Sequence, residues 1–429
     1  IWLMSYPLMI SLIIEHMIGL TDAVFLGRVG DVALGACALG GVYYMAMFML
    51  AFGFGFGAQI IIARRNGERR YNRVHGCYFM LVLAVALFAA SQYFSPIILR
   101  DIIESPQVYG ATADYVHWRT YGIFFSFLCV MFRAYYVGIT QTKILTVNSI
   151  VMLLSNVALN YCLIFGKGGF PAAGIAGAAI ASSVSEAVSL LFFIIYTSMT
   201  ADKRKYGFRR AFTLRPHLLK GILSISGWTM VQSFISVSIW FIFFLAIEHL
   251  GERPLAVTNI VRNISALLIM VISAFATTAG ALISNQIGAG EQRCLFKTCG
   301  MTLKLTYAIL IPLLIILCLF PESVLRAFTD SPSLIAASVN SVYVMASSTL
   351  IMAPSFILFN AVSGTGNTRA GFIMEMISLA VYTAVIYYGI IRLKPDVALC
   401  WFSEHVYGVT LIFLAWWYLK SGKWRGKKV

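Results

Sequence analysis

Long apolar runs, each followed by a short polar loop, constrain the fold of this chain more than any other feature. Twelve such runs reach or exceed the roughly 20 residues that a helix needs to cross the hydrocarbon core of a bilayer. We expect spans at Trp2–Leu26, Val32–Ala63, Val74–Leu99, Ala113–Val137, Ile144–Gly166, Gly174–Met199, Leu218–Ile247, Pro254–Ile287, Leu295–Phe320, Leu334–Val362, Ala370–Arg392 and Val397–Leu419. The alternation that is typical of transmembrane β-strands is absent, so the sequence predicts an all-α integral membrane protein with twelve transmembrane helices.

The composition agrees with a membrane protein and excludes a soluble one. Hydrophobic residues make up 60% of the 429 residues and charged residues only 11%, whereas a soluble domain carries roughly 25% charged residues. The net charge is +15, and nearly all of the excess lies in the tail and in the loops that follow even-numbered spans. Because basic loops stay on the cytoplasmic side, we expect both termini in the cytoplasm, a prokaryotic inner membrane as the location, and no nucleic-acid partner. We also expect a short cytoplasmic leader before Ile1, since the first span starts there.

The chain repeats itself weakly. Gly30–Leu34 corresponds to Gly251–Leu255, and Gly138–Lys143 corresponds to Gly364–Arg369. Six spans separate the matched segments, so the two repeats share one orientation, as in transporters built from parallel repeats. We therefore expect two pseudo-symmetric six-helix lobes at 1–199 and 218–419, with a basic cytoplasmic linker at 200–217 and a basic cytoplasmic tail at 420–429.

Carboxylates at membrane depth are the second informative feature. Glu15 and Asp22 lie seven residues apart, about two helical turns, so both point to the same side of the first predicted helix. Asp22 lies about 6 Å and Glu15 about 16 Å below the outer end of that helix. A carboxylate inside the membrane costs about 2.5–3.5 kcal/mol on insertion scales and usually marks an ion, proton or substrate route.

Two further helices carry polar side chains at similar depths. Asn160 and Asn156, near the end of the fifth span, lie about 9 Å and 15 Å below its outer end. Ser182 and Glu186, in the sixth span, lie about 12 Å and 18 Å below its outer start. Residues four apart share a helix face, so we expect three helices of the first lobe to present these groups to one another. The plainer alternative is that these groups only hydrogen-bond the helices together.

Motifs along the whole chain follow the order found in one transporter family. They are Thr21–Gly30 (TDAVFLGRVG), Gly53–Gln59 (GFGFGAQ), Asn156–Gly166, Gly174–Ala181 and Ser284–Gly290 (SNQIGAG). By these residues the chain resembles the multidrug and toxic compound extrusion (MATE) transporters. The resemblance extends over essentially the whole chain and includes the two-lobe plan.

The resemblance implies that Asp22 binds the coupling cation with help from Asn156, Asn160 and Ser182. It implies no cofactor and no resident metal, although these four residues are also a possible Na⁺ site. The chain differs from several prokaryotic relatives at Asn160, where they carry Asp, and this lowers the negative charge available to hold Na⁺. We expect Glu15 and Glu186 to supply the missing acid, with Glu15 and Asp22 titrating as a coupled pair.

The expected function is secondary active antiport. Amphipathic organic cations, including drugs, would leave the cell in exchange for H⁺ or Na⁺ by alternating access, with the protein working as a monomer in the bilayer. The alternative is a flippase of the same superfamily for a lipid-linked anionic substrate, which needs a basic central cavity. An enzyme is not expected, because neither a GxSxG nor an HExxH motif is present.

Several other side chains at membrane depth are candidates for the substrate cleft. The candidates are Tyr43, Tyr136, Trp240 and Arg262. The aromatic residues could contact flat or cationic substrates by stacking and cation–π interaction, although such residues more often pack between helices. Arg262 lies about 12 Å into the eighth span, where we expect it to pair with an acid of the first lobe or to meet an anionic substrate. Glu375 and Glu404 of the second lobe could reach the surface, pair, or form a lesser site.

The glycine run Gly53–Gly57 superficially resembles a nucleotide-binding loop. It lies inside a predicted spanning helix with no strand before it, so dinucleotide binding is not expected. Glycines in such a helix allow neighbouring helices to approach closely.

Overall fold

The protein is helical throughout the part of the chain that the computed structural model describes. That part comprises residues 1–69, 77–103, 105–200, 216–248 and 250–426, without the side chains of a few helical residues, Trp240 among them. Eleven helices in it are long and apolar enough to span a membrane, and α4 with α5 make a twelfth span if the bent pair is counted as one. The predicted all-α membrane fold is thereby confirmed. The predicted linker 200–217 lies largely outside the described residues, as does the end of the predicted tail.

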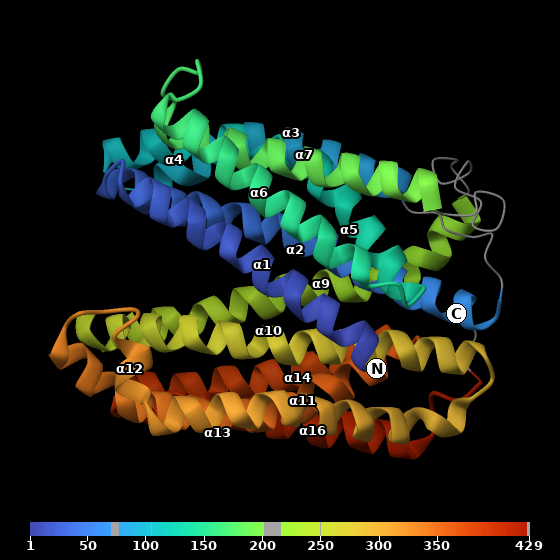
Figure 1. Ribbon diagram of the computed structural model, residues 1–429. Coiled ribbons are helices and arrows are strands. Elements are labelled where there is room, and N and C mark those ends of the chain that lie inside the picture. Colours follow the sequence, from blue (N-terminus) through green and yellow to red (C-terminus); the bar gives the residue numbers. More distant parts are fainter. Residues whose placement is uncertain (70–76, 104, 201–215, 249, 427–429) are drawn as a thin grey trace. The chain divides into compact units, whose positions relative to one another are not determined.

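The chain divides into two compact units, residues 10–230 (the N-unit) and residues 1–9 with 231–429 (the C-unit). The helices of the first half are α1 (Trp2–Gly27), α2 (Asp31–Gly67), α3 (Cys77–Ile102), α4 (Pro106–Thr120), α5 (Ile123–Gly138), α6 (Lys143–Phe165) and α7 (Gly174–Thr200) (Figure 1). Those of the second half are α9 (Pro216–Glu248), α10 (Glu252–Gly288), η2 (Gln292–Cys294), α11 (Leu295–Leu319), α12 (Pro321–Leu325), α13 (Pro332–Gly364), α14 (Thr368–Val385), η3 (Ile386–Arg392), α15 (Val397–Cys400) and α16 (Phe402–Ser421).

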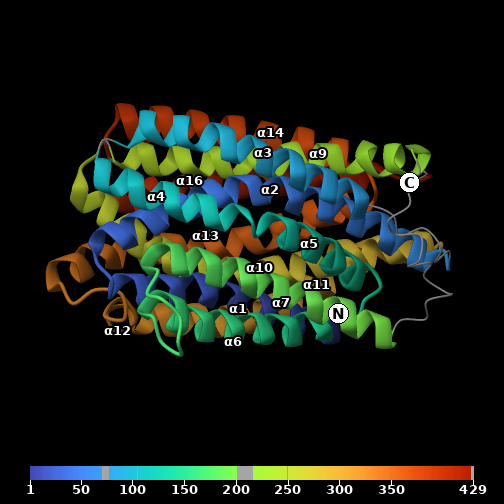
Figure 2. The same ribbon diagram turned by 90° about the horizontal axis from the view of Figure 1, so that it is seen from above.

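Small residues bring the helices of the N-unit close together. Within this unit α6 packs along α7, and the two run side by side in Figures 1 and 2. The glycine run of α2 faces two neighbours: Gly53 lies against the backbone of α9 at Met230, and Gly55 lies against Val130 of α5. The hydroxyl of Thr229 donates to the Gly53 carbonyl at 2.6 Å. A Cβ at either glycine would overlap its neighbour, so the run serves helix packing, as the sequence predicts.

The fourth predicted span, Ala113–Val137, is not one continuous helix. It is built from α4 and α5, which meet at an angle of 50° across Tyr121 and Gly122. Gly122 leaves no room for a Cβ, because the side chains of Arg119 and Glu186 lie directly against its Cα. The bend therefore occurs where a polar pair occupies the space beside the backbone.

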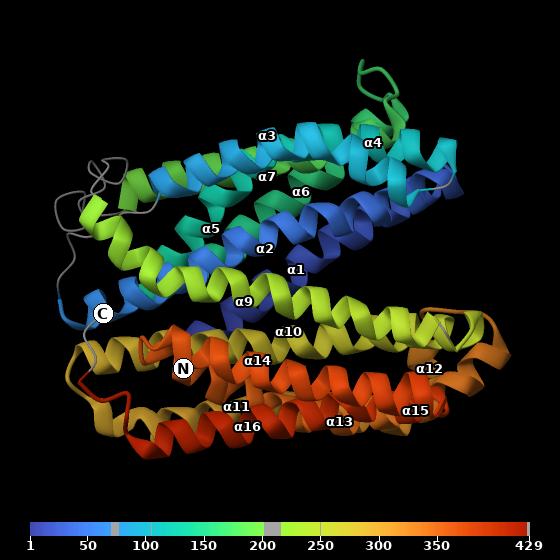
Figure 3. The ribbon, with the colours of Figure 1, turned by 180° about the vertical axis from the view of Figure 1, so that it is seen from behind.

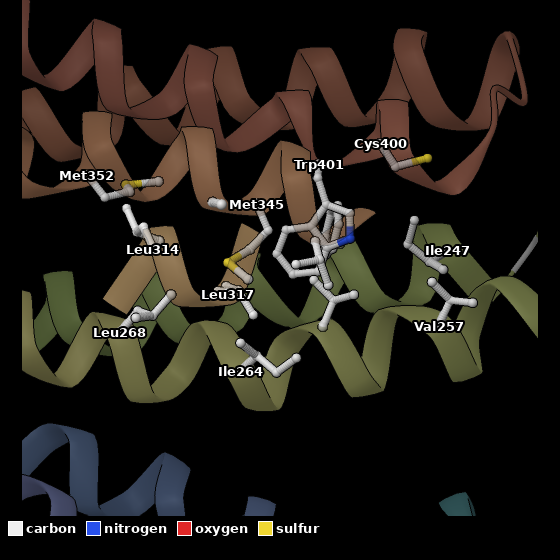
Figure 4. Close-up of a cluster of buried hydrophobic side chains, with 14 of the residues drawn as sticks. Ile247, Val257, Ile264, Leu268, Leu314, Leu317, Met345, Met352, Cys400 and Trp401 are labelled. Atoms are coloured by element: carbon white, nitrogen blue, oxygen red, sulfur yellow. The ribbon is translucent and has the colours of Figure 1, made fainter. Parts of the chain in front are cut away.

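The C-unit is organised around α10 and α13. These two helices pack along each other, and α13 also packs along α16 (Figure 3). Gly280 of α10 lies against the backbone of α13 at Asn360, and Gly364 of α13 lies against Gly280, with no space for a Cβ on either glycine. Toward the other end of the helices, large side chains fill the core, with Trp401 and Met345 between α10 and α13 (Figure 4). Lipid is as apolar as these side chains, so close packing rather than water exclusion holds such helices together.

The two halves of the chain share local geometry at the positions that the sequence repeat matches. Helices α2 and α10 both have 37 residues, and each follows a glycine with positive φ, 147° at Gly30 and 118° at Gly251. After α5 and α13 the chain turns through left-handed residues, Thr140 with φ 63° and Gly366 with φ 86°. The repeat in the sequence therefore corresponds to repeated helix starts and turns.

Candidate cation-coupling site

Asp22 is enclosed by amide and hydroxyl groups from α6 and α7. Its side chain belongs to the last turns of α1 and is 8% exposed. Asn160 donates from Nδ2 to Asp22 Oδ1 at 2.6 Å, and Ser182 donates from Oγ to Asp22 Oδ2 at 2.9 Å. Asn160 Nδ2 also reaches Asn156 Oδ1 at 3.0 Å, and Asn156 Nδ2 reaches Ser182 Oγ at 3.2 Å. The structure thus brings together four of the six side chains predicted for the coupling site.

This cluster has the chemistry of a proton or hard-cation site. Its inward-facing atoms are mainly oxygens, which Na⁺ and similar hard cations prefer. Asn160 Oδ1 is buried and has no hydrogen-bond partner among the described residues. Rotation of the Asn160 amide would turn this oxygen toward Asp22, where it could accept from a protonated carboxyl or contact a bound cation. The cluster can therefore provide hydrogen-bond partners for the Asp22 side chain both when it is ionised and when a proton or cation is bound to it.

Glu15 lies in a separate cluster with Arg133. Arg133 on α5 donates from Nη1 to Glu15 Oε1 at 2.6 Å and to Oε2 at 2.8 Å. Ser11 on α1 and Ser149 on α6 donate to Glu15 Oε1 at 3.0 and 3.1 Å. No hydrogen bond within the described residues joins Glu15 to Asp22, although both belong to α1. Glu15 is therefore ion-paired with an arginine and is not hydrogen-bonded to Asp22 in this part of the structure.

Glu186 also has an arginine partner. Arg119, in the last turn of α4, donates from Nη2 to Glu186 Oε1 at 2.6 Å and from Nη1 to Oε2 at 2.9 Å. The Tyr44 hydroxyl donates to the same carboxylate at 3.1 Å, and its ring lies 3.7 Å from the Arg119 guanidinium carbon. The side chains of Arg119 and Glu186 are only 12% and 7% exposed. This ion pair links the end of α4, at the bend between α4 and α5, to α7.

The three acids of the N-unit interior differ in the charge of their partners. Glu15 and Glu186 are each neutralised by an arginine, whereas the hydrogen-bond partners of Asp22 among the described residues are all neutral. An ionised carboxylate without a cationic partner is expensive at membrane depth. Within this cluster, a bound cation would balance the charge of Asp22.

A family model matches the chain over residues 7–162 and 229–388 under the description MatE. The chain belongs to the MATE family. The two matched segments fall in the two halves of the chain, in agreement with the repeat. Members of this family are membrane transporters and not enzymes.

Named relatives of this MATE-family chain include a probable multidrug resistance protein NorM from Mannheimia succiniciproducens. The two are 25% identical over 293 residues, an alignment that covers 67% of this chain and 63% of the length of the relative. Two solved structures share the fold. One is an outward-facing multidrug resistance MATE transporter, with a TM-score of 0.89 and 18% identity over 98% of this chain and 95% of that chain. The other, from Pyrococcus furiosus Vc1, is a MOP superfamily transporter described as having a binding pocket of reversed polarity; its TM-score is 0.86, with 19% identity and the same coverage.

Sequence reasoning missed Arg119 and Arg133. Both lie in the fourth predicted span, where a charged side chain is as costly as the acids of the other spans. Two arginines and two glutamates within the predicted spans of one lobe indicate two ion pairs. On that basis Glu15 and Glu186 would have been assigned to arginines and not to the site of Asp22. The signal was present, but the partner of each acid depends on how α5 and α7 pack.

The predicted cleft residues occupy different surroundings. Tyr43 donates to Ser91 Oγ at 3.1 Å. Tyr136 is 2% exposed and shares a hydrogen bond of 2.7 Å with Thr197, so its ring packs inside the N-unit. The Arg262 guanidinium carbon lies 5.1 Å from the centre of the Phe244 ring, in the C-unit. The Trp240 side chain lies outside the described residues.

Glu375 and Glu404 of the C-unit are held by hydroxyl groups. Glu375 on α14 accepts from Ser236 on α9 at 2.8 Å and from Tyr407 on α16 at 2.9 Å. Glu404 on α16 accepts from Tyr382 on α14 at 2.8 Å. Each of these two carboxyl groups therefore forms a hydrogen bond between α14 and α16, so a role in linking the two helices accounts for its position.

Proposed function

We propose that this MATE-family chain exports amphipathic organic cations, including drugs, in exchange for H⁺ or Na⁺ that binds at Asp22. Export would proceed by alternating access. The names of the relatives, which are described as multidrug resistance proteins and transporters, favour this substrate class. The observation that carries the proposal is that the hydrogen-bond partners of Asp22 in the described part of the chain are neutral.

The exchange follows from the charge of Asp22. When the carboxylate is ionised, the donors of Asn160 and Ser182 stabilise it and its field attracts an organic cation. When H⁺ or Na⁺ binds, the negative charge is cancelled and the attraction to the organic cation is lost. The two cations therefore compete for one charge, which is the thermodynamic requirement for antiport.

The groups around Asp22 favour binding of a proton over binding of Na⁺. A proton needs only the carboxylate of Asp22, whereas Na⁺ needs several oxygens at once and gains from added negative charge. Because Glu15 and Glu186 are occupied by arginines, neither contributes a free charge to this cluster. We therefore favour H⁺ as the coupling ion, with Na⁺ as the alternative.

A lipid-linked anion is the other substrate class considered, and it is less well supported. It requires positive charge in the binding region. Arg119 and Arg133 would supply it, but each is paired with a glutamate, and Asp22 makes the sum of these five groups negative. The known fold neighbour with reversed pocket polarity shows only that the fold is shared.

The proposed setting is the cytoplasmic membrane of a prokaryote, with both termini in the cytoplasm. The basic loops after even-numbered spans support this orientation. The partners would be small-molecule substrates and lipid, with the protein as a monomer. No cofactor is needed, since the ion gradient supplies the free energy.

The test is transport by the purified full chain in proteoliposomes that start with a fluorescent organic cation at equal concentration inside and outside. A pH gradient alone, then a Na⁺ gradient alone, is imposed, and dye movement is followed. We expect movement against the dye gradient under the pH gradient. No response to either gradient would contradict the proposed function, and a response to Na⁺ alone would overturn the choice of H⁺.

A further inference from the structure

The chain stays attached to the C-unit where α16 ends. Gly422 adopts the left-handed conformation, with φ 68°, and ends the helix, as glycine commonly does at this position. Residues 422–426 then fold back in turns, and the Arg425 N–H donates to the Gly422 carbonyl at 3.0 Å. The Trp424 side chain is 3% exposed and donates from Nε1 to the Leu419 carbonyl at 2.9 Å. The segment after α16 is therefore a packed part of the C-unit.

The buried Trp424 side chain determines where the neighbouring charges lie. Trp424 belongs to an apolar cluster that also contains Leu295 of α11. Lys423 and Arg425, on either side of it in the chain, are both exposed, as is Lys420 in the last turn of α16. We call Lys420, Lys423 and Arg425 the basic turn. Anchoring of the indole holds these three cations at the surface of the unit.

The cations of the basic turn are not balanced by carboxylates. None of the three forms an ion pair with a described residue. Lys420 Nζ lies 4.6 Å from the centre of the Trp416 ring, and the Arg425 guanidinium carbon lies 5.7 Å from the centre of the Trp424 ring. These contacts leave the positive charge uncompensated. In the sequence, residues 405–429 contain five Lys or Arg and neither Asp nor Glu.

Other charged groups at the same end of the C-unit do not reverse this sign. The start of α14 lies beside α16, because Asn367 Nδ2 donates to the Tyr418 hydroxyl. The start of α11 lies there too, since Leu295 shares the cluster of Trp424. The exposed charged residues at these two helix starts are Glu291, Arg293, Lys297 and Arg369. This end of the unit is therefore strongly positive.

Exposed aromatic side chains place the basic turn at the level of lipid headgroups. Helix α16 belongs to a segment, Val397–Ser421, that is long and apolar enough to span a membrane. Phe413 and Trp417 are 64% and 61% exposed, and with Lys420 they follow the spacing of one helix face. Exposed tryptophans gather where hydrocarbon meets headgroups. Lys420 lies about 5 Å further along the axis, so the face runs from apolar through aromatic to cationic.

We propose that the basic turn binds the phosphate of an anionic phospholipid, with the acyl chains along the exposed face of α16 at Phe413 and Trp417. Clustered Lys and Arg directly after a spanning helix attract anionic lipids. A zwitterionic lipid carries its own ammonium group, which these cations repel. The ligand class that fits is therefore a lipid with net negative charge, such as phosphatidylglycerol. The inference concerns a surface that takes no part in the proposed exchange at Asp22.

The test compares two lipids that differ only in the headgroup. The purified full chain in detergent is titrated with dioctanoyl phosphatidylglycerol or dioctanoyl phosphatidylcholine, and bound lipid is counted by native mass spectrometry. The basic-turn variant combines Lys420→Gln, Lys423→Gln and Arg425→Gln. The matched control combines Arg326→Gln, Arg392→Gln and Lys394→Gln, which removes three exposed cations from the opposite end of the same unit.

The preference for the anionic lipid should depend on the basic turn. We expect wild-type protein to bind phosphatidylglycerol about tenfold or more tightly than phosphatidylcholine. The Kd for phosphatidylglycerol should rise about tenfold in the basic-turn variant and change less than about twofold in the control. Inorganic phosphate at the same concentration should not displace the lipid, because it lacks the acyl chains. Because the three side chains are exposed, the variant should keep the melting temperature of lipid-free wild type.

A milder variant covers the case of an unstable triple variant. Lys423→Gln with Arg425→Gln keeps the contact between Lys420 and Trp416, and it should weaken phosphatidylglycerol binding severalfold. Wild-type affinity for phosphatidylglycerol in both basic-turn variants would overturn the inference. So would an equal loss in the matched control, which would indicate attraction by net charge alone. Equal binding of the two lipids by wild-type protein, or displacement of the lipid by phosphate, would also contradict it.

Discussion

The Asn160 amide donates from Nδ2 to Asp22 Oδ1 at 2.6 Å, across α6 and α1. Hydrogen bonds to an ionised carboxylate are shorter and stronger than hydrogen bonds between neutral groups. Asn160 also reaches Asn156, so its orientation is linked to a second amide and through it to Ser182. A change in the charge of Asp22 would therefore alter hydrogen bonds that join α6 to α7.

Replacing Asn160 by Asp should change the coupling ion. A second carboxylate beside Asp22 adds negative charge, which favours Na⁺, and two adjacent carboxyls tend to share one proton. We expect the Asn160→Asp variant to export dye severalfold faster under a Na⁺ gradient than the wild type does. Initial rates in proteoliposomes at fixed pH measure this, with Asn160→Ala as the control. Identical ion responses of the Asp variant and the wild type would contradict the assignment.

The hydroxyl of Ser182 should matter for transport more than its size does. Ser182→Ala removes a donor from Asp22 Oδ2, and hydrogen bonds to charged groups are worth about 1.5–3 kcal/mol. We expect coupled efflux to fall about tenfold in Ser182→Ala, and the hydroxyl of Ser182→Thr to preserve most of the rate. Rates are compared at equal amounts of protein in the membrane. If both variants behave alike, the hydroxyl has no role in coupling.

The ion pair between Arg119 and Glu186 should be structural. Glu186→Gln leaves a buried arginine without its counter-charge, at a cost of about 3–5 kcal/mol. We expect a clear fall in the melting temperature of the purified protein. The double variant Arg119→Met with Glu186→Met removes both charges and should recover most of the loss. A Glu186→Gln protein as stable as the wild type would show that the pair does not hold the bend.

Two glycines of α2 offer a matched test of helix packing. Gly53 lies against the backbone of α9 at Met230, whereas Gly41 has open space around its Cα. Gly53→Ala should lower stability by about 1–3 kcal/mol through overpacking. Gly41→Ala should leave the melting temperature unchanged or raise it slightly. Equal effects of the two substitutions would contradict the close approach of α2 and α9.

Much of the fold could be predicted because the membrane limits what a chain can do. Each spanning helix must satisfy its own backbone and reach about 20 residues, so the apolar runs give the helices to within a few residues. The break between α4 and α5 was not predicted, because it depends on Arg119 and Glu186 meeting beside Gly122. The π-helical turn Ile386–Arg392 that ends the eleventh span also has no signal in its apolar sequence.

The candidate site was predicted in part for a similar reason. Helical spacing places Asn156 and Asn160 on one face of α6, and depth brings them level with Asp22 and Ser182. Periodicity and depth do not determine which neighbour a long side chain meets. The sequence therefore predicts that Glu15 and Glu186 join Asp22 in one site, whereas each of them pairs with an arginine on another helix.

The central claim is that Asp22 carries the coupling cation, and the Asp22→Asn variant tests it most directly. Asn has nearly the same shape but cannot be charged, so the protein should still insert and fold. Gradient-driven dye export by purified Asp22→Asn protein is measured in proteoliposomes beside the wild type and protein-free vesicles. The account predicts that the variant does not exceed the protein-free background. Export by Asp22→Asn at the wild-type rate would contradict it.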